Sequence, residues 1–79
     1  MRKNATEVAF LVHDEEDMEI LTLMLFRKKK RCYVIPQRYD VLNVAYYVVT
    51  DVLKTPEITK ILQDYKRAGG FEEPIIKFR

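Results

Sequence analysis

The stretch from Asp40 to Lys54, DVLNVAYYVVTDVLK, places the strongest constraint on how this 79-residue chain can fold. Its apolar residues recur at i, i+1, i+4, i+7, i+8, i+11 and i+12, which is the broad stripe of a helix that faces a core. They are Val41, Leu42, Ala45, Val48, Val49, Val52 and Leu53. Asn43 and Thr50 fall on the opposite, polar side. The valines favour a strand, because branching at Cβ restricts χ1. However, fifteen residues without a turn signal exceed the usual strand length. The pattern therefore predicts a central buried helix over 40–54.

Two shorter segments before this stretch have simpler patterns. Residues 6–12 are rich in β-branched and aromatic residues and predict a strand covered on both faces, with a buried helix as the alternative. Asp14 can cap a helix and the acids after it suit its first turn, so a helix is expected at about 15–29. Cys32 to Ile35 predicts a second strand that ends at Pro36, because proline cannot donate to a sheet ladder.

The chain after Lys54 carries the best local signals. Thr55-Pro56-Glu57 combines a cap, a proline at the first helical position and an acid that suits the helix dipole. The apolar residues after Glu57 have helical spacing, and Gly69-Gly70 ends this run. A helix is therefore predicted over 56–68. Residues 75–79 predict a final edge strand, kept at the edge by Pro74.

These elements predict a single α+β domain over residues 1–79, in the order β-α-β-α-α-β. Residues 1–4 are expected to form a frayed basic end. The sheet is small, and the central helix of the three is expected to pack between layers. If the helix at 15–29 is a crossover, the strands at 6–12 and 32–35 are parallel neighbours with a right-handed connection.

The chain is too short for a second core, and a core of this size supplies only about 3–5 kcal/mol of net stability. Cys32 is the single cysteine and His13 the single histidine, so neither a disulfide within the chain nor a structural zinc site is expected, and no cofactor is predicted. With a disulfide and a zinc site excluded, binding to a partner chain is the remaining way to stabilise so small a core. The longest uncharged run of the central stretch covers about half a bilayer span, and the N-terminus does not have the pattern of a signal peptide. The expected location is cytoplasmic.

No catalytic constellation is visible in the sequence. His13 and Cys32 are the candidates for a base and a nucleophile, but no orienting third group, glycine-rich loop or nucleophile elbow accompanies them. We therefore predict that the protein is not an enzyme.

Tyrosines near the middle of the chain are the first candidate site. Tyr46 and Tyr47 lie off the main stripe of the predicted helix, with Val44 nearby. Exposed tyrosines are enriched at protein interfaces, so these three residues are predicted to bind a protein. If two layers cover the helix all round, they are core residues instead.

A basic run is the second candidate site. It comprises Arg27, Lys28, Lys29, Lys30 and Arg31, with Arg38, Tyr33 and Tyr39 nearby. Cations can neutralise phosphates and tyrosines can stack on unpaired bases, so this run could contact nucleic acid. The alternative is a set of solvated cations that suit the end of a helix.

In size, dense charge and lack of any enzyme signature, the chain resembles the small early proteins that phages use to redirect or block host machinery. This resemblance implies inhibition by binding a host enzyme, polymerase or division protein. The leading hypothesis is a non-enzymatic protein-binding module, with either another protein or a second copy as its partner. The alternative is a small nucleic-acid-binding protein that uses residues 27–31.

Overall fold

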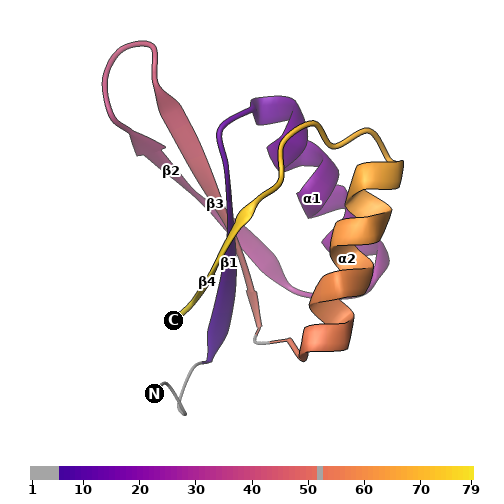
Figure 1. The fold of residues 1–79 in the computed structure, drawn as a ribbon. Helices are drawn as coiled ribbons and strands as arrows, with labels where there is room; N and C mark the ends of the chain where they lie inside the picture. Colours follow the sequence, from indigo (N-terminus) through magenta and orange to yellow (C-terminus); the bar gives the residue numbers. More distant parts are fainter. Residues whose placement is uncertain (1–5, 52) are drawn as a thin grey trace.

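Four strands form one sheet, and two helices lie on one of its faces (Figure 1). The computed structural model describes residues 6–51 and 53–79. The elements are β1 (Glu7–Val12), α1 (Glu15–Arg27), β2 (Cys32–Arg38), β3 (Val44–Asp51), α2 (Thr55–Arg67) and β4 (Ile75–Phe78). The α+β class is confirmed, but the order is β-α-β-β-α-β and the described residues contain two helices instead of three.

The sheet order is β2-β3-β1-β4, and every pair of neighbouring strands is antiparallel. Each helix therefore connects two parallel strands that have a third strand between them. This is the split β-α-β arrangement of ferredoxin-like domains. The expectation that the first two strands are neighbours is wrong, because β3 lies between β1 and β2.

The predicted helix over 40–54 is wrong as well. Residues 44–51 form β3, which pairs with β1 on one side and β2 on the other. A central strand carries apolar residues on both of its faces, so the alternation that reveals an exposed strand is lost. Ala45, Val48 and Val49 are buried as the stripe predicted, but in a strand. Their spacing matched a helical template by coincidence.

The start of that stretch is a hairpin loop between β2 and β3. Asp40 closes the loop, because its carboxylate accepts from the backbone N–H groups of Leu42, at 2.8 Å, and Asn43, at 2.9 Å. Val41 and Leu42 are therefore exposed instead of belonging to a core stripe. Val52, also assigned to that stripe, lies outside the described residues.

Thr50 was expected on a polar face, and it is buried. Its hydroxyl donates to the carbonyl oxygen of Arg31 at 2.5 Å, which satisfies the polar group inside the protein. Strand geometry explains the difference, since Thr50 points to the same side of β3 as Val48.

The elements that the sequence predicts from local signals are present in the structure. The predicted strand at 6–12 is β1, although the helices cover only one of its faces, and the final strand is β4 at the sheet edge. Asp14 caps α1, accepting from the N–H of Glu16 at 3.0 Å. The helix predicted over 56–68 is α2, although Lys54 instead of Thr55 occupies its N-cap position. β2 continues through Pro36 because β2 is an edge strand, whose outer side has no ladder partner in the sheet.

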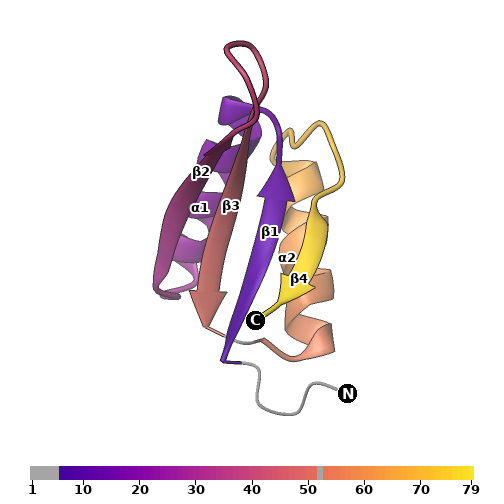
Figure 2. The same ribbon diagram turned by 90° about the vertical axis from the view of Figure 1, so that its left-hand side faces the viewer.

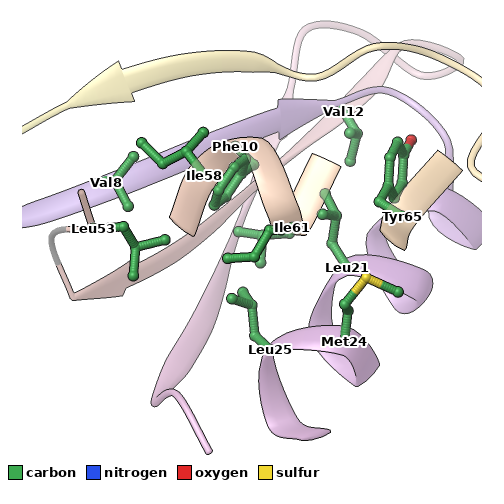
Figure 3. Packing of buried hydrophobic residues seen from close by; sticks show 11 residues of the cluster. Val8, Phe10, Val12, Leu21, Met24, Leu25, Leu53, Ile58, Ile61 and Tyr65 are labelled. Carbon is green, nitrogen blue, oxygen red and sulfur yellow. The ribbon is translucent and has the colours of Figure 1, made fainter. Parts of the chain in front are cut away.

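The core lies between the sheet and the two helices. Figure 3 shows side chains of β1 pointing toward those of α1 and α2. The buried members of this cluster are Val8, Phe10, Val12, Leu21, Met24, Leu25, Val48, Leu53, Ile58, Ile61 and Tyr65. In β1 and β3 these core residues have even numbers, so the odd-numbered residues point to the other face of the sheet.

A buried carboxylate ties α1 to the segment between α2 and β4. Asp17 accepts from the hydroxyl of Tyr65 at 2.7 Å and from the backbone N–H groups of Phe71, at 3.2 Å, and Glu72, at 3.0 Å. Burial alone would raise the pKa of Asp17, but these hydrogen bonds outweigh it and hold the pKa below its usual value. The carboxylate is therefore ionised inside the protein.

Candidate protein-binding surface

The face of the sheet opposite the helices is uncovered by any element within residues 6–51 and 53–79. Figure 2 views the molecule from this side, with both helices behind the strands. We call it the open face. Strand alternation and register place rows of side chains on it; two rows cross all four strands, and a third continues the pattern just beyond the ends of β2 and β4.

Two of the rows are mostly apolar and occupy the middle of the open face. The Tyr47 row consists of Ile35, Tyr47, Leu11 and Ile75. The Val49 row consists of Tyr33, Val49, Ala9 and Lys77. In both rows the side chains of the outer strands are more accessible: Tyr33 is 48% exposed and Ile75 is 52% exposed. Leu11, Val49 and Ala9 are buried between their larger neighbours.

The third row is charged and lies at one end of the open face. This charged row consists of Arg31, Asp51, Glu7 and Arg79, in the order of the strands. Arg31 Nη2 lies 3.9 Å from Asp51 Oδ1, and the Tyr33 hydroxyl donates to Glu7 Oε2 at 2.7 Å. That hydrogen bond raises the pKa of Tyr33, so the tyrosine stays neutral. The open face therefore has an apolar middle and a charged rim.

Tyr47 lies at the centre of the apolar area. Its register partners are Leu11 on β1 and Ile35 on β2. The ammonium group of Lys77 lies 5.9 Å from the centroid of the Tyr47 ring, within the range of a cation–π contact. A half-buried tyrosine held by a cation and two aliphatic neighbours is pre-ordered, so binding costs it little entropy.

The structure separates the three residues predicted to bind a protein. Tyr47 lies on the open face, whereas Tyr46 and Val44 point to the helix side of β3. Tyr46 packs against the core cluster. Tyr33, Ile35, Leu11, Ile75 and Lys77 belong to the surface around Tyr47 but were missed. Strand alternation is the signal that could have found them. It applies because residues 44–51 form a strand and not the predicted helix.

The basic run does not form one free cationic patch. Lys28 Nζ lies 3.0 Å from Asp64 Oδ2, Lys30 Nζ lies 3.1 Å from Glu57 Oε2, and Arg31 pairs with Asp51. The hydrogen bond from Lys28 is the largest contribution that holds the pKa of Asp64 below its usual value. Three cations of the run thus neutralise carboxylates of α2 and β3.

The remaining cations of that candidate site lie apart from one another. Arg27 and Lys29 are exposed at the end of α1. Arg38 is the last residue of β2, at the opposite end of that strand from Arg31. The sheet therefore does not bring Arg38 and the basic run together.

His13 and Cys32 are also far apart. Cys32 pairs with Thr50, which pairs with Val8 near the start of β1, whereas His13 follows the end of that strand. Glu72 binds His13, with Oε2 3.3 Å from Nδ1, and burial raises the pKa of the Cys32 thiol. A thiol with a raised pKa is a poor nucleophile at neutral pH.

The hairpin loop over residues 39–43 is a second exposed apolar feature. It projects beyond the rest of the sheet in Figure 1, and Val41 and Leu42 are 82% and 89% exposed. The hydrogen bonds of Asp40 with Asn43 and Leu42 hold the loop and lower the pKa of Asp40. These hydrogen bonds hold the loop in a turn whose tip presents Val41 and Leu42 to solvent.

No protein-family model and no curated protein matches this chain. Within the described residues, neither helix is long and apolar enough to cross a membrane. The same residues contain no group of histidine, cysteine and acidic side chains that could hold a metal ion.

Proposed function

We propose that this protein is a non-enzymatic binding module that occupies the surface of another protein through its open face. The observation that carries the proposal is the uncovered apolar middle of the sheet, centred on Tyr47 and flanked by exposed parts of Tyr33 and Ile75. An apolar, aromatic centre with a charged rim is the usual anatomy of a protein interface. The resemblance to small phage proteins suggests that occupying such a surface blocks the partner's function.

Nucleic-acid binding through residues 27–31 is the alternative and has less support. Lys28, Lys30 and Arg31 already pair with carboxylates. Phosphate binding would have to displace these pairs, and Asp64 and Glu57 would then repel the phosphates. Binding to an oligonucleotide that falls steeply with salt and depends on Lys28 and Lys30 would favour this alternative.

The test is capture of partners from an extract of the host by immobilised protein, followed by mass spectrometry. We expect capture that changes little with salt concentration, because the surface is apolar. Replacing Tyr47 by alanine should weaken capture by about tenfold or more, since truncating an interface anchor typically costs about 2 kcal/mol. Thermal melts of each variant separate lost binding from lost folding.

Tyr39 provides the matched control. It is an exposed tyrosine on the hairpin loop, outside the open face. Tyr39→Ala should leave capture unchanged. If Tyr39→Ala abolishes capture and Tyr47→Ala does not, the binding surface is the hairpin loop and the proposal is wrong.

A further inference from the structure

We infer that the partner protein adds an extended segment of its chain to the sheet at β2, the strand that forms one edge of the open face. The inference rests on the proposed function, since it names the part of the partner that binds there. β2 is the last strand on its side of the sheet, and Figure 2 shows none of the described helices or strands beside it. An added strand would continue the Tyr47 row beyond Ile35 and the Val49 row beyond Tyr33.

The hydrogen-bond pattern between β2 and β3 determines which backbone groups of β2 point outward. The N–H of Tyr39 donates to the carbonyl oxygen of Asn43 at 2.8 Å, so these two residues form a hydrogen-bonded pair. In an antiparallel ladder such pairs alternate with pairs that are not hydrogen-bonded. Counting back along β2 from Tyr39, the odd-numbered residues bond to β3, and the even-numbered residues direct their N–H and C=O groups away from it.

Cys32, Val34 and Pro36 are therefore the residues whose backbone faces outward along most of this edge. Pro36 fits such a position, because its nitrogen has no hydrogen to donate to β3. Cys32 and Val34 each present a donor and an acceptor that have no partner strand in the described sheet, and Pro36 presents an acceptor. Another β-strand carries the matching groups at the same spacing. The edge thus suits an extended backbone.

The side chains of β2 suit an uncharged segment that has a carboxylate near each end. Residues 32–37 carry no charge, whereas charged side chains commonly protect the edge strands of natural sheets. Arg31 and Arg38 lie at the two ends of this run and are exposed; the side chain of Arg31 is 90% accessible although it pairs with Asp51. An extended chain covers the distance between the two arginines in about seven residues, or about 23 Å.

These features define the segment. We expect about five uncharged residues, with β-branched or aromatic side chains at the alternate positions that lie beside Tyr33 and Ile35. An acidic residue near each end would pair with Arg31 or Arg38. The other edge strand is less suitable, because β4 has four residues, contains Lys77 and follows Pro74.

A different protein fits this edge better than a second copy of the chain. Two copies of β2 paired over the same residues would bring two copies of Pro36 into the new ladder. Each proline would leave the acceptor opposite it without a donor. A segment that contains no proline meets this defect only once.

Selection of peptides from a displayed library of random dodecapeptides, with the whole 79-residue chain immobilised, tests the inference. We expect enriched peptides with an uncharged, alternating β-branched or aromatic centre and flanking acids. The decisive variant carries a methyl group on the backbone nitrogen of Val34. It can be assembled by native chemical ligation at Cys32, which joins a thioester of residues 1–31 to a synthetic peptide of residues 32–79.

Methylation at Val34 should weaken binding of the enriched peptides by about tenfold or more, because it removes a hydrogen bond and places a methyl group in the added ladder. Methylation of the Ile76 nitrogen on β4 is the matched control. Arg79 and Glu7 form a hydrogen-bonded pair, so alternation directs the N–H of Ile76 away from the sheet as well. This control should bind like the original chain, and circular dichroism verifies that both variants are folded.

Amide hydrogen exchange of the unmodified chain gives a second readout that needs no variant. A bound peptide should slow exchange of the Val34 N–H by about tenfold or more and leave the Ile76 N–H unchanged. Failure to enrich any peptide, binding that methylation at Val34 does not weaken, or a Val34 amide that gains no protection would each overturn the inference.

The inference and the proposed function can fail separately. If Tyr47→Ala weakens capture of the partner protein and methylation at Val34 does not, the partner occupies the open face without adding a strand. That result would overturn the inference alone. Capture that depends on neither Tyr47 nor the Val34 N–H would contradict the proposed function too.

Discussion

Tyr65 on α2 donates its hydroxyl proton to Asp17 on α1 at 2.7 Å, in a buried contact between residues 48 positions apart in the chain. The same hydroxyl oxygen lies 2.7 Å from the carbonyl oxygen of Glu72. One contact therefore joins both helices to the segment that leads into β4. Since β4 forms one edge of the open face, the Asp17–Tyr65 contact helps to position that face.

The first prediction concerns the stability of this contact. Tyr65→Phe removes the hydroxyl and should lower the free energy of unfolding by about 1.5–3 kcal/mol, as expected for a hydrogen bond to a buried charge. Urea unfolding followed by circular dichroism measures the change. Tyr33→Phe is a matched control, because Tyr33 also donates to a carboxylate at 2.7 Å but in an exposed pair. Tyr33→Phe should lower the free energy of unfolding by less than about 0.5 kcal/mol. Equal losses for the two variants would contradict a special role for the buried pair.

The second prediction concerns pH. The pKa of Asp17 is lower in the folded protein than its unfolded value of about 3.9. Its ionised form therefore stabilises the fold fully above the unfolded pKa, and this stabilisation disappears as pH falls through the folded pKa. Asp17→Asn does not titrate. The stability difference between the original chain and Asp17→Asn should be constant from about pH 5 to 8 and shrink below about pH 4. A difference that grows with acidity would mean that the pKa of Asp17 is raised.

The third prediction concerns Gly70, which packs directly against the ring of Tyr65. A Cβ at position 70 would overlap three atoms of that ring, and the ring cannot retreat because Asp17 and the core hold it. Gly70→Ala should therefore lower the free energy of unfolding by about 1–3 kcal/mol. The loss of stability caused by Gly70→Ala should be smaller when Tyr65 is also replaced by alanine. A double-mutant cycle measures this coupling. Strictly additive costs would show that the overlap is not with Tyr65.

The sequence predicted those elements whose signals are local. The acids and cap of α1, the proline near the start of α2 and the glycines after it act within a few residues, so both helices were found. β3 was missed because its burial on both faces depends on β1 and β2, which no local pattern reports. Asp17 was interpreted as one of several first-turn acids, and its donors at Tyr65, Phe71 and Glu72 come from the far end of the chain.

The same difference between local and long-range signals explains which residues of the candidate site the sequence could predict. Tyr47 was selected because it lay off a helical stripe, and its place on the open face follows from strand alternation instead. The basic run was recognised as a cluster of charges. Its carboxylate partners on α2, Asp64 and Glu57, could not be found, because only the tertiary packing of the chain brings them near the run.

The fourth prediction concerns the end of α1. Lys29 has φ of 61°, in the left-handed region that disfavours residues with a Cβ. It follows the last turn as C-cap glycines usually do, and the N–H of Lys30 donates back to the carbonyl of Leu25 at 2.9 Å. Lys29→Gly should raise the free energy of unfolding by about 0.5–1 kcal/mol, measured as a higher Tm. Lys29→Ala keeps the strain and should give no such gain. A lower Tm for Lys29→Gly would contradict this account.

Site-specific photocrosslinking tests the central claim, that binding occurs at the open face, most directly. A benzophenone amino acid is placed at Tyr33 on the open face, or at Leu23 on α1, whose exposures of 48% and 49% are nearly equal. Each variant is irradiated in the cell extract from which partners are captured. The account predicts crosslinked protein from position 33 and none above background from position 23. Crosslinks from position 23, with none from position 33, would contradict it.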